Sequence, residues 1–376
     1  MSMVEWKKIE DLGPYFGGLT GKTKDDFVDG NAKFITYKNV FANPSLDINT
    51  TGEVKIIKGE KQNKIQKGDI LFTGSSEIPE EAGMSCVVTE NLKGDYYMNS
   101  FCFGVRLNNP DNYCLDYLKH VLRSSNIRKE IAKSASGVTR FNISKARFGK
   151  VLIPCPSLSE QEKLADQLDS FTSSIENLKE QIALRRKQYD YYRDQLLDLE
   201  GKEGVEMRQL ETIAEIGTGS SNTQDELEKG KYPFFVRFQI VRWKDEYEFD
   251  ETAVITSGDG VGVGKVLHYY EGKYALHQRA YRIHIIVEDV IPKFLFYFMQ
   301  KDFYNYIMSN AYAASVTSVR KPMLLKYPIP VPSLAEQQRI VDILDKFEAS
   351  IQNLEEQLSQ REKQYEYYRN KLLTFE

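Results

Sequence analysis

The chain has 376 residues, of which 41% are apolar, and its formal net charge is −4. That apolar share supplies buried cores and excludes a disordered chain. Because no apolar run approaches the roughly 18 residues of a membrane helix, and no charged segment precedes an apolar one at the N-terminus, we expect a cytoplasmic protein without a membrane span or secretory signal.

Cysteine and histidine are too scattered for a metal centre or a disulfide framework. All four cysteines lie in the first half at irregular spacings, and none of the four histidines forms a ligand pair beside them. Asp111, Asp116 and Lys119 imitate a metal-dependent nuclease centre only poorly. Since metal sites need ligands at short, regular spacings, we expect no metal, no cofactor and no disulfide.

The first segment, residues 1–152, is predicted to be globular, with several strands followed by one helix. Its runs of β-branched and aromatic residues are bounded by Gly, Asn and Asp. The expected strands are 34–41, 54–57, 69–73, 86–89 and 101–107, and the expected helix is 113–133.

Residues 153–200 are predicted to form a stiff linker and then a long helix. Pro154 and Pro156 keep the entry extended, because prolines lack an amide donor and restrict the residue before them. Ser157 and Glu160 have the spacing of a capping box, in which the serine caps the helix and the glutamate reaches back.

A heptad repeat runs along this helix without a break. Apolar residues recur at alternating steps of four and three, and one arginine interrupts the stripe. A packed amphipathic helix is the alternative, but its period of 3.6 drifts by about 20° per heptad and would lose the register. The pattern therefore predicts a coiled coil. The seam consists of Leu164, Leu168, Phe171, Ile175, Leu178, Ile182 and Arg185.

The third segment, residues 201–328, begins and ends like the first. Residues 205–211 resemble 4–10, and 314–318 correspond loosely to 136–140, while the sequence between differs. Similar frames around different interiors suggest related folds with different surfaces. The expected strands are 233–238, 253–255, 266–270 and 274–286, and the expected helix is 292–310.

The last segment, residues 329–376, repeats 153–200 at a constant offset of 176 residues without a gap. Repetition at this fidelity indicates one architectural unit used twice. We expect the two helices to pack on each other as an antiparallel coiled coil. The second seam consists of Ile340, Leu344, Phe347, Ile351, Leu354, Leu358 and Arg361.

Charge is divided unevenly among the four segments, which in chain order carry +4, −4, −1 and −3. The acidity lies on the helices, and basic residues cluster toward the ends of the globular segments. Such clusters can neutralise phosphate. Solvated helix faces explain them equally well from sequence alone. The clusters include Arg123, Arg128, Lys129, Lys133, Arg140, Lys145, Arg147, Lys150, Arg320, Lys321 and Lys326.

The glycine-rich run 258–265 only superficially resembles a phosphate-binding loop. The position that should hold its first glycine is Asp259, and Val266 follows Lys265 where Ser or Thr is required. The run also lies between predicted strands, where a Rossmann loop would precede a helix. We predict a glycine hairpin whose backbone approaches a ligand.

His277, Gln278 and Arg279 lie within the expected strand 274–286. Arginine and glutamine are the side chains that pair with guanine and adenine edges. A strand holding them beside the glycine hairpin could read a DNA groove. An internal polar network is the alternative.

Over its whole length the chain resembles the specificity subunit of type I restriction-modification systems. The entries to the helices at 153–161 and 329–337 share the motif Ile-Pro-x-Pro-Ser-Leu-x-Glu-Gln, which is very like the family's own. The runs 258–265 and 277–279 resemble a common type of recognition domain in that family. The first globular segment lacks both runs, so contacts cannot be transferred from one half to the other.

The resemblance implies an α+β fold with two α/β-mixed target-recognition domains, 1–152 and 201–328, joined by the helices of 153–200 and 329–376 in a cyclic, roughly two-fold arrangement. It implies a subunit without catalysis, whose partners are double-stranded DNA, two methylation subunits per chain and, through them, restriction subunits. The candidate DNA-binding residues are Lys133, Ser136, Arg140, Lys145, Gly260, Gly262, Lys265, His277, Gln278, Arg279, Thr317, Ser318, Arg320 and Lys321.

A coiled-coil scaffold with protein-binding ends is the competing hypothesis. Steep salt dependence of DNA binding would favour recognition over scaffolding. Under the recognition hypothesis the helix acts as a ruler: the 35 residues from Leu164 to Leu199 span about 52 Å at about 1.5 Å per residue. The expected target is two unlike half-sites separated by a fixed gap.

Overall fold

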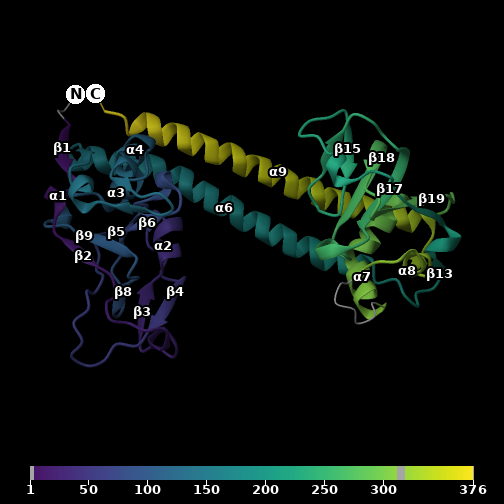
Figure 1. The fold of residues 1–376 in the computed structure, drawn as a ribbon, viewed down its shortest axis with the longest axis horizontal. Helices are drawn as coiled ribbons and strands as arrows, with labels where there is room; N and C mark the ends of the chain where they lie inside the picture. Colours follow the sequence, from purple (N-terminus) through teal and green to yellow (C-terminus); the bar gives the residue numbers. More distant parts are fainter. Residues whose placement is uncertain (1–3, 311–317, 376) are drawn as a thin grey trace. The chain divides into compact units, whose positions relative to one another are not determined.

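The computed structural model describes residues 4–310 and 318–375. The chain forms two compact units: residues 1–179 with 356–376 make the first, and residues 180–355 make the second. Each unit therefore contains one globular part and a section of each long helix (Figure 1). The fold class is α+β, as predicted. Within the described residues, no helix combines the length and apolar character needed to cross a membrane.

The first unit contains twelve strands among its described residues, most of them short. They are β1 (Glu5–Lys8), β2 (Tyr15–Gly17), β3 (Ala32–Ile35), β4 (Thr51–Val54), β5 (Asp69–Thr73), β6 (Ser75–Ser76), β7 (Ser85–Val87), β8 (Tyr96–Met98), β9 (Cys102–Arg106), β10 (Ala135–Ser136), β11 (Phe141–Ile143) and β12 (Leu152–Cys155). Its short helices are α1 (Ile9–Leu12), α2 (Tyr37–Ala42), α3 (Leu115–Val121), α4 (Ser125–Lys133) and α5 (Lys145–Phe148).

These strands form one central sheet and three smaller ones. The central sheet has the order β2-β9-β5-β7, and all its pairs are antiparallel. A second sheet has the order β4-β3-β8 with a parallel β3–β8 pair, and a third has the order β10-β11-β6. Strands β1 and β12 pair as a separate ribbon.

The second unit is built around one six-stranded sheet of order β14-β19-β17-β18-β15-β16, in which only the β15–β18 pair is parallel. A separate ribbon pairs β13 with β20. The strands are β13 (Glu206–Gln209), β14 (Ala214–Thr218), β15 (Tyr232–Phe235), β16 (Arg242–Lys244), β17 (Phe249–Ser257), β18 (Leu267–Leu276), β19 (Ala280–Ile285) and β20 (Pro328–Val331). Helices α7 (Pro292–Asn310) and α8 (Lys321–Leu325) follow the sheet.

Two predicted elements coincide with the observed ones, namely the strand 69–73 and the helix 292–310. The predicted strand 34–41 is wrong beyond Ile35. There the Thr36 hydroxyl accepts a hydrogen bond from the amide of Asn39 at 3.1 Å and caps helix α2. The predicted helix 113–133 is also interrupted, because Ser124 between α3 and α4 has an extended backbone, with ψ at 148°.

The proline-rich segments before the long helices are extended, as predicted, and each is also a paired strand. Trp6 lies opposite Pro154 in the first ribbon, and Met207 lies opposite Pro330 in the second. Each ribbon therefore joins the first strand of a globular part to the segment that enters the long helix. Proline is tolerated here because a two-stranded ribbon has only edge strands.

The long helices α6 (Leu158–Leu196) and α9 (Leu334–Leu372) each have 39 residues. The hydroxyls of Ser157 and Ser333 accept the amides of Glu160 and Glu336 at 3.4 Å, which is the serine half of each capping box. The Glu336 carboxylate pairs with Arg339.

A buried glutamine fixes the first turn of each long helix to its own globular part. Gln161 accepts the amide of Cys114, just before α3, at 3.0 Å and donates to the carbonyl of Pro156 at 2.8 Å. Gln337, at the same place in the repeat, accepts the amide of Ile291, just before α7, at 2.9 Å and donates to the carbonyl of Pro332 at 2.8 Å. Both side chains are buried.

About two helical turns further on, an aspartate repeats this connection. Asp169 bonds Lys119 at 2.8 Å and His120 at 2.7 Å, both in α3. Asp345 bonds Lys293 and Tyr297 of α7. Two of the three residues that resembled a nuclease centre, Asp116 and Lys119, are thus part of an ion-pair network between α3 and α6. Within residues 4–310 and 318–375, no cluster of histidine, cysteine and acidic side chains could hold a metal ion.

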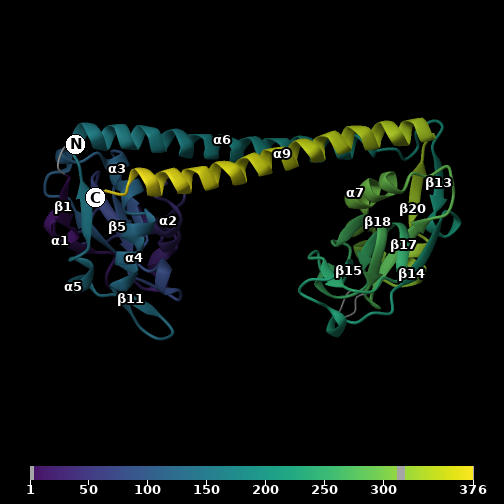
Figure 2. The ribbon, with the colours of Figure 1, turned by 90° about the horizontal axis from the view of Figure 1, so that it is seen from above.

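The far end of each long helix packs on the other globular part. The core of the first unit contains Leu373 from beyond α9, and the core of the second contains Leu197 from beyond α6. Figures 1 and 2 show the last turns of α9 against the first globular part. Each globular part therefore holds the start of one long helix and the end of the other, which is the connection that a cyclic arrangement requires.

The predicted seam residues are all buried or half-buried, as a coiled coil requires. In the first unit the Phe171 ring stacks on the Tyr368 ring with centroids 5.3 Å apart, and the Arg361 guanidinium lies 5.8 Å from the centroid of the Phe171 ring. The second unit repeats this arrangement: the rings of Phe347 and Tyr192 have centroids 5.4 Å apart, and the Arg185 guanidinium lies 5.8 Å from the Phe347 centroid. In each unit the residue numbers of α6 rise along the contact as those of α9 fall, so the two helices run antiparallel. The leading seam residues instead join the globular cores: Leu164, Leu168, Ile340 and Leu344.

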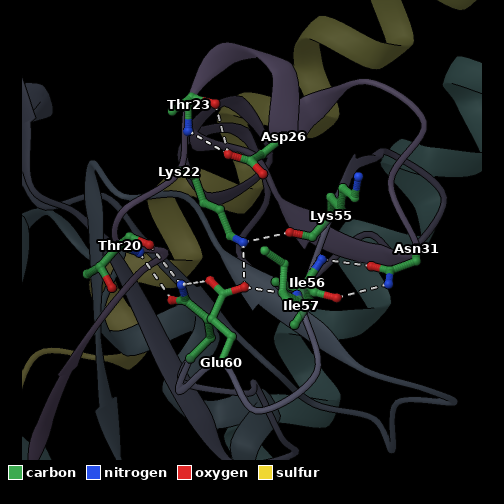
Figure 3. Close-up of polar contacts among 10 residues, drawn as sticks. Thr20, Lys22, Thr23, Asp26, Asn31, Lys55, Ile56, Ile57 and Glu60 are labelled. Atoms are coloured by element: carbon green, nitrogen blue, oxygen red, sulfur yellow. Dashed lines mark hydrogen bonds and ion pairs between the residues drawn. The ribbon is translucent and has the colours of Figure 1, made fainter.

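Outer loops of the first unit are tied together by polar contacts, shown in Figure 3. Lys22 donates to the Glu60 carboxylate and to the carbonyl of Lys55, both at 2.6 Å. Asn31 exchanges two hydrogen bonds with the backbone of Ile56. Hydrogen bonds from Lys22, Gln62 and the amide of Ile57 lower the pKa of Glu60 to about 2, so this carboxylate stays charged well into acid.

We predict that Gln161→Ala and Gln337→Ala each lower the free energy of unfolding by about 2 kcal/mol, because a buried amide and carbonyl lose their partners. Hydrogen exchange locates the effect: the amide of Cys114 should lose protection in the first variant and that of Ile291 in the second. Gln167→Ala and Gln338→Ala change exposed glutamines of the same helices and serve as controls. Unchanged exchange at Cys114 and Ile291 would contradict this role.

Candidate nucleic-acid interface

The predicted strand 274–286 is interrupted at the three residues that pointed to DNA. Strand β18 ends at Leu276 and β19 begins at Ala280, so His277, Gln278 and Arg279 form the turn between them. The His277 carbonyl accepts the amide of Ala280 at 2.9 Å, which closes the turn. Apolar residues flank the turn on both sides, at Ala275 and Leu276 and again at Ala280 and Tyr281, so the prediction of one continuous strand passed over three consecutive polar residues.

His277 is buried, and both of its ring nitrogens have partners. Nδ1 accepts the amide of Arg279 at 3.0 Å, so the ring proton lies on Nε2, which is 3.3 Å from the Thr223 hydroxyl. Burial and then the positive charge of Arg237 lower the pKa of His277 and favour the neutral ring. Its side chain therefore belongs to the internal network that shapes the turn.

Gln278 and Arg279 are exposed and are oriented by neighbouring groups. The Gln278 side-chain amide donates to Asn222 at 3.0 Å. Arg279 donates through Nη1 to Asp259 at 3.0 Å, and Arg237 donates to the other oxygen of the same carboxylate at 2.9 Å. Arg279 remains 61% exposed, so one edge of its guanidinium is held while the rest faces solvent.

The Asp259 carboxylate is the centre of this cluster. Burial alone would raise its pKa, but hydrogen bonds from Arg237 and Arg279 outweigh burial and lower the pKa below its usual 3.8. Asp259 was the residue that disqualified the phosphate-binding loop. The structure gives it a different task, which is to attach the glycine-rich run to the 277–279 turn.

The glycine-rich run connects β17 to β18, which pair antiparallel, so the predicted hairpin is confirmed. Gly260 has a φ of 79°, a conformation that favours glycine, and a Cβ on Gly262 would lie 2.5 Å from the Arg237 carbonyl. Val261 between them is 85% exposed. Lys265, also exposed, lies with its ammonium 5.3 Å from the centre of the Tyr304 ring.

Ser318, Arg320 and Lys321 belong to the segment that pairs with the start of the glycine-rich run. Ser318 forms an antiparallel β-bridge with Asp259, and the amide of Val319 donates to the carbonyl of Gly258 at 2.8 Å. Arg320 and Lys321 are exposed at the start of α8. Thr317, another candidate, lies outside the described residues.

The first unit contains the same backbone frame, although its sequence has neither the glycine run nor His-Gln-Arg. The amide of Gly74 donates to the carbonyl of Phe101 at 2.8 Å, as Gly258 does to Arg279 at the same distance. The amide of Ile143 donates to the carbonyl of Gly74 at 2.9 Å, as Val319 does to Gly258. In this shared hydrogen-bond pattern Phe101 therefore occupies the position of Arg279.

The turn in this first frame is also closed in the same way. The side chain of Asn99 accepts the amide of Phe101 at 2.9 Å, in the manner of His277, and its carbonyl accepts the amide of Cys102 at 3.0 Å. A Cβ on Gly74 would lie 2.8 Å from the Phe101 carbonyl, and one on Gly258 would lie 2.6 Å from that of Arg279. Sequence comparison missed this frame because backbone hydrogen bonds and two glycines define it.

Other candidates in the first unit surround this frame. Arg140 donates from Nε to the Ser75 hydroxyl at 2.9 Å and lies over the exposed ring of Phe101 at 5.3 Å. Ser136 is exposed and pairs with Asn142 between β10 and β11. Lys145 has its ammonium over the Phe103 ring. Lys133, at the end of α4, pairs with Glu130.

Two other arginines of the basic cluster have structural roles. Arg123 donates to the carbonyl of Ser85 and to several carbonyls at the end of α2, and Arg128 donates to the carbonyls of Gly83 and Ala82. Burial lowers the pKa of each to about 10. These two side chains therefore serve neither of the roles expected from the sequence, which were phosphate contact and a solvated helix face.

Comparisons with known proteins match this arrangement. A family model described as the type I restriction modification DNA specificity domain matches residues 1–185 and again residues 202–362. The specificity subunit of the Escherichia coli type I restriction enzyme EcoR124I/EcoR124II is 32% identical over 266 residues, which are 60% of this chain and 63% of that protein. The match thus spans less than two thirds of that relative.

Solved structures share the fold. The S subunit of a type I restriction-modification system from M. genitalium superposes with a TM-score of 0.60 at 16% identity, covering 100% of this chain and 97% of that one. A chain from a structure of complex assembly and conformational transition in the type I R-M system gives a TM-score of 0.64 at 16% identity, covering 98% and 97%.

We predict that Asp259→Asn frees the glycine-rich run from the turn, because both arginines lose their ion pair. The amides of Gly258 and Val319 should exchange faster, while the rest of the second unit is unchanged. In the unaltered protein, the lowered pKa of Asp259 means that its stabilisation is complete above pH 3.8 and is lost as the pH falls through the folded-state pKa. Asp250→Asn, an exposed change on β17, is the control, and equal exchange in both variants would contradict the prediction.

Proposed function

This chain belongs to the type I restriction modification DNA specificity family, and on that premise we propose that it is the DNA specificity subunit of a type I restriction-modification complex. Residues 1–152 and 201–328 are its target-recognition domains, and the helices of 153–200 and 329–376 join them. It selects the DNA, and partner subunits carry out methylation and restriction. The chain itself is not catalytic and needs no cofactor.

The observation that carries this proposal is the backbone frame that occurs once in each globular part. Its third turn position is Phe101 in one and Arg279 in the other, and both side chains are exposed. Arginine and glutamine recognise guanine and adenine edges, whereas phenylalanine offers apolar contact. Two equal frames with unlike side chains suit a bipartite target whose half-sites differ, separated by a gap that the helices set.

Exposed cations beside the frames are the candidates for phosphate contact. Lys265, Arg320 and Lys321 lie beside the second frame, and Lys145 lies in the first unit. Each neutralised phosphate releases bound counterions, so affinity falls steeply with salt. This slope separates DNA recognition from the alternative of a coiled-coil scaffold, whose protein contacts need not show it.

Complex formation is proposed to involve two methylation subunits, with restriction subunits joining through them. Support comes from exposed apolar residues at matching places in the two halves: Trp6 and Met207 on the ribbons, and Leu158 and Leu334 at the helix starts. Trp6 and Leu152 also line a hollow of about 650 Å³. Exposed apolar groups that recur in a repeat suit two copies of one partner.

The mass of the complex assembled with its methylation subunit should correspond to two such subunits per chain. Trp6 and Leu158 belong to the first of the two proposed contact surfaces, so the double variant W6S/L158S should retain one methylation subunit per chain. Substitution of two exposed serines, Ser170→Ala and Ser359→Ala, is a matched control that should retain both. A native mass with one methylation subunit in the unaltered complex would contradict the repeat-based stoichiometry.

Co-expression with the methylation subunit in a host lacking adenine methylation, followed by genome-wide mapping of modified bases, tests the proposed function. We expect a two-part motif with a constant gap, because two unlike frames are fixed to a pair of continuous helices. A contiguous motif would mean that one domain alone reads DNA. A stable complex with active methylation subunits that modifies no site would contradict the specificity role.

A further inference from the structure

Phe101 is unusual among the phenylalanines because it is 58% exposed and lies at the centre of a defined turn. Its amide donates to Asn99, and its carbonyl accepts the amide of Gly74. Both backbone groups are therefore used by the frame, and the ring projects from it without forming part of the core. Exposing a large apolar side chain on a fixed turn has a cost that a binding contact would offset.

Arg140 limits the motion of this ring. Its guanidinium lies over one face of Phe101 at 5.3 Å and is itself held by the Ser75 hydroxyl at 2.9 Å. Ser75 in turn pairs with Asn142, and its carbonyl accepts the hydroxyl of Tyr37 at 2.7 Å. The ring is therefore presented in one orientation, which reduces the conformational entropy lost on binding.

The corresponding position of the second frame carries an arginine that Asp259 orients in a comparable way. One frame thus presents a charged hydrogen-bond donor, and the other presents an apolar ring beside a cation. In the major groove of DNA, the apolar feature among the base edges is the 5-methyl group of thymine. A fixed phenylalanine can contact that methyl group but can form no hydrogen bond with a base edge.

We propose that Phe101 determines specificity in one half-site by apolar contact with the 5-methyl group of a thymine. This inference rests on the proposed DNA-recognition function and adds the contact chemistry of the first domain. Arg140 acts as a positioning residue that holds the ring.

The test uses the complete complex with its methylation subunit and duplexes that carry the mapped motif. Each thymine of the motif is replaced in turn by uracil, which differs only in lacking the methyl group. At one position in one half-site, uracil should weaken binding about fourfold, the value for one buried methyl group. In Phe101→Ala the same replacement should cause no further loss, so the two changes are not additive.

Two further variants make the outcome specific. Arg279→Ala should weaken binding through the other half-site and retain the full uracil effect, and Arg140→Ala should reduce that effect without abolishing it. Hydrogen exchange at the amide of Gly74 should be unchanged in Phe101→Ala, which shows that the frame persists.

The inference is overturned if no thymine position responds to uracil, or if the response persists in Phe101→Ala. A ring that separates stacked bases would give the first of these results, since stacking does not need the methyl group. Failure of the proposed function is a different outcome: the unaltered complex would then modify no two-part motif at all.

Discussion

The buried glutamine at the start of each long helix is the contact on which both units depend. Its side-chain amide offers an acceptor and donors, and in both Gln161 and Gln337 all of the recorded partners are backbone groups. Backbone groups do not change with sequence, so the same joint can serve two globular parts that share little else. The joint also connects three elements at once: the ribbon, the long helix and the segment before α3 or α7.

The second constraint is that each long helix ends on the globular part it did not start from. Phenylalanine, tyrosine and arginine meet in the same way in each unit, as Phe171, Tyr368 and Arg361 show for the first. The exposed ion pairs do not follow this repeat, however, because the same helix carries the positive charge in both units. Helix α6 supplies the cation in both, through Lys179 to Glu362 and through Arg186 to Glu355. Each such pair contributes at most about 1 kcal/mol. Pairing of α6 or α9 with its own copy would instead bring like charges together, so the charges favour the α6–α9 pair.

How far the sequence predicts the fold depends on how far apart the interacting residues are. The seam, the helix starts and helix α7 follow from periodicity and capping, which act over a few residues, and these were predicted. Helix α2 was missed because a single bond, from the amide of Asn39 to the Thr36 hydroxyl, decides it inside a run rich in β-branched and aromatic residues. The turn at His277 was missed because apolar residues continue on both sides of it, and the bond that closes it, from the amide of Ala280 to the carbonyl of His277, uses backbone groups alone. The first frame could not be found at all, since Gly74 and Phe101 meet only once β5, β8 and β9 are in place.

The two frames also explain why recognition can differ while the fold does not. Every bond that defines a frame uses backbone groups, the close approach of Gly74 or Gly258, and one side-chain acceptor, which is Asn99 or His277. The exposed ends of Phe101 and Arg279 take no part in closing the turn. A change at either position therefore alters what is presented to a ligand and leaves the turn intact. The orienting groups differ as well, since Asp259 reaches Arg279 from the glycine-rich β17–β18 hairpin, whereas Arg140 reaches Phe101 from the β10–β11 loop. Contact chemistry in each half is thus set by a pair of side chains that can vary independently of the backbone that carries them.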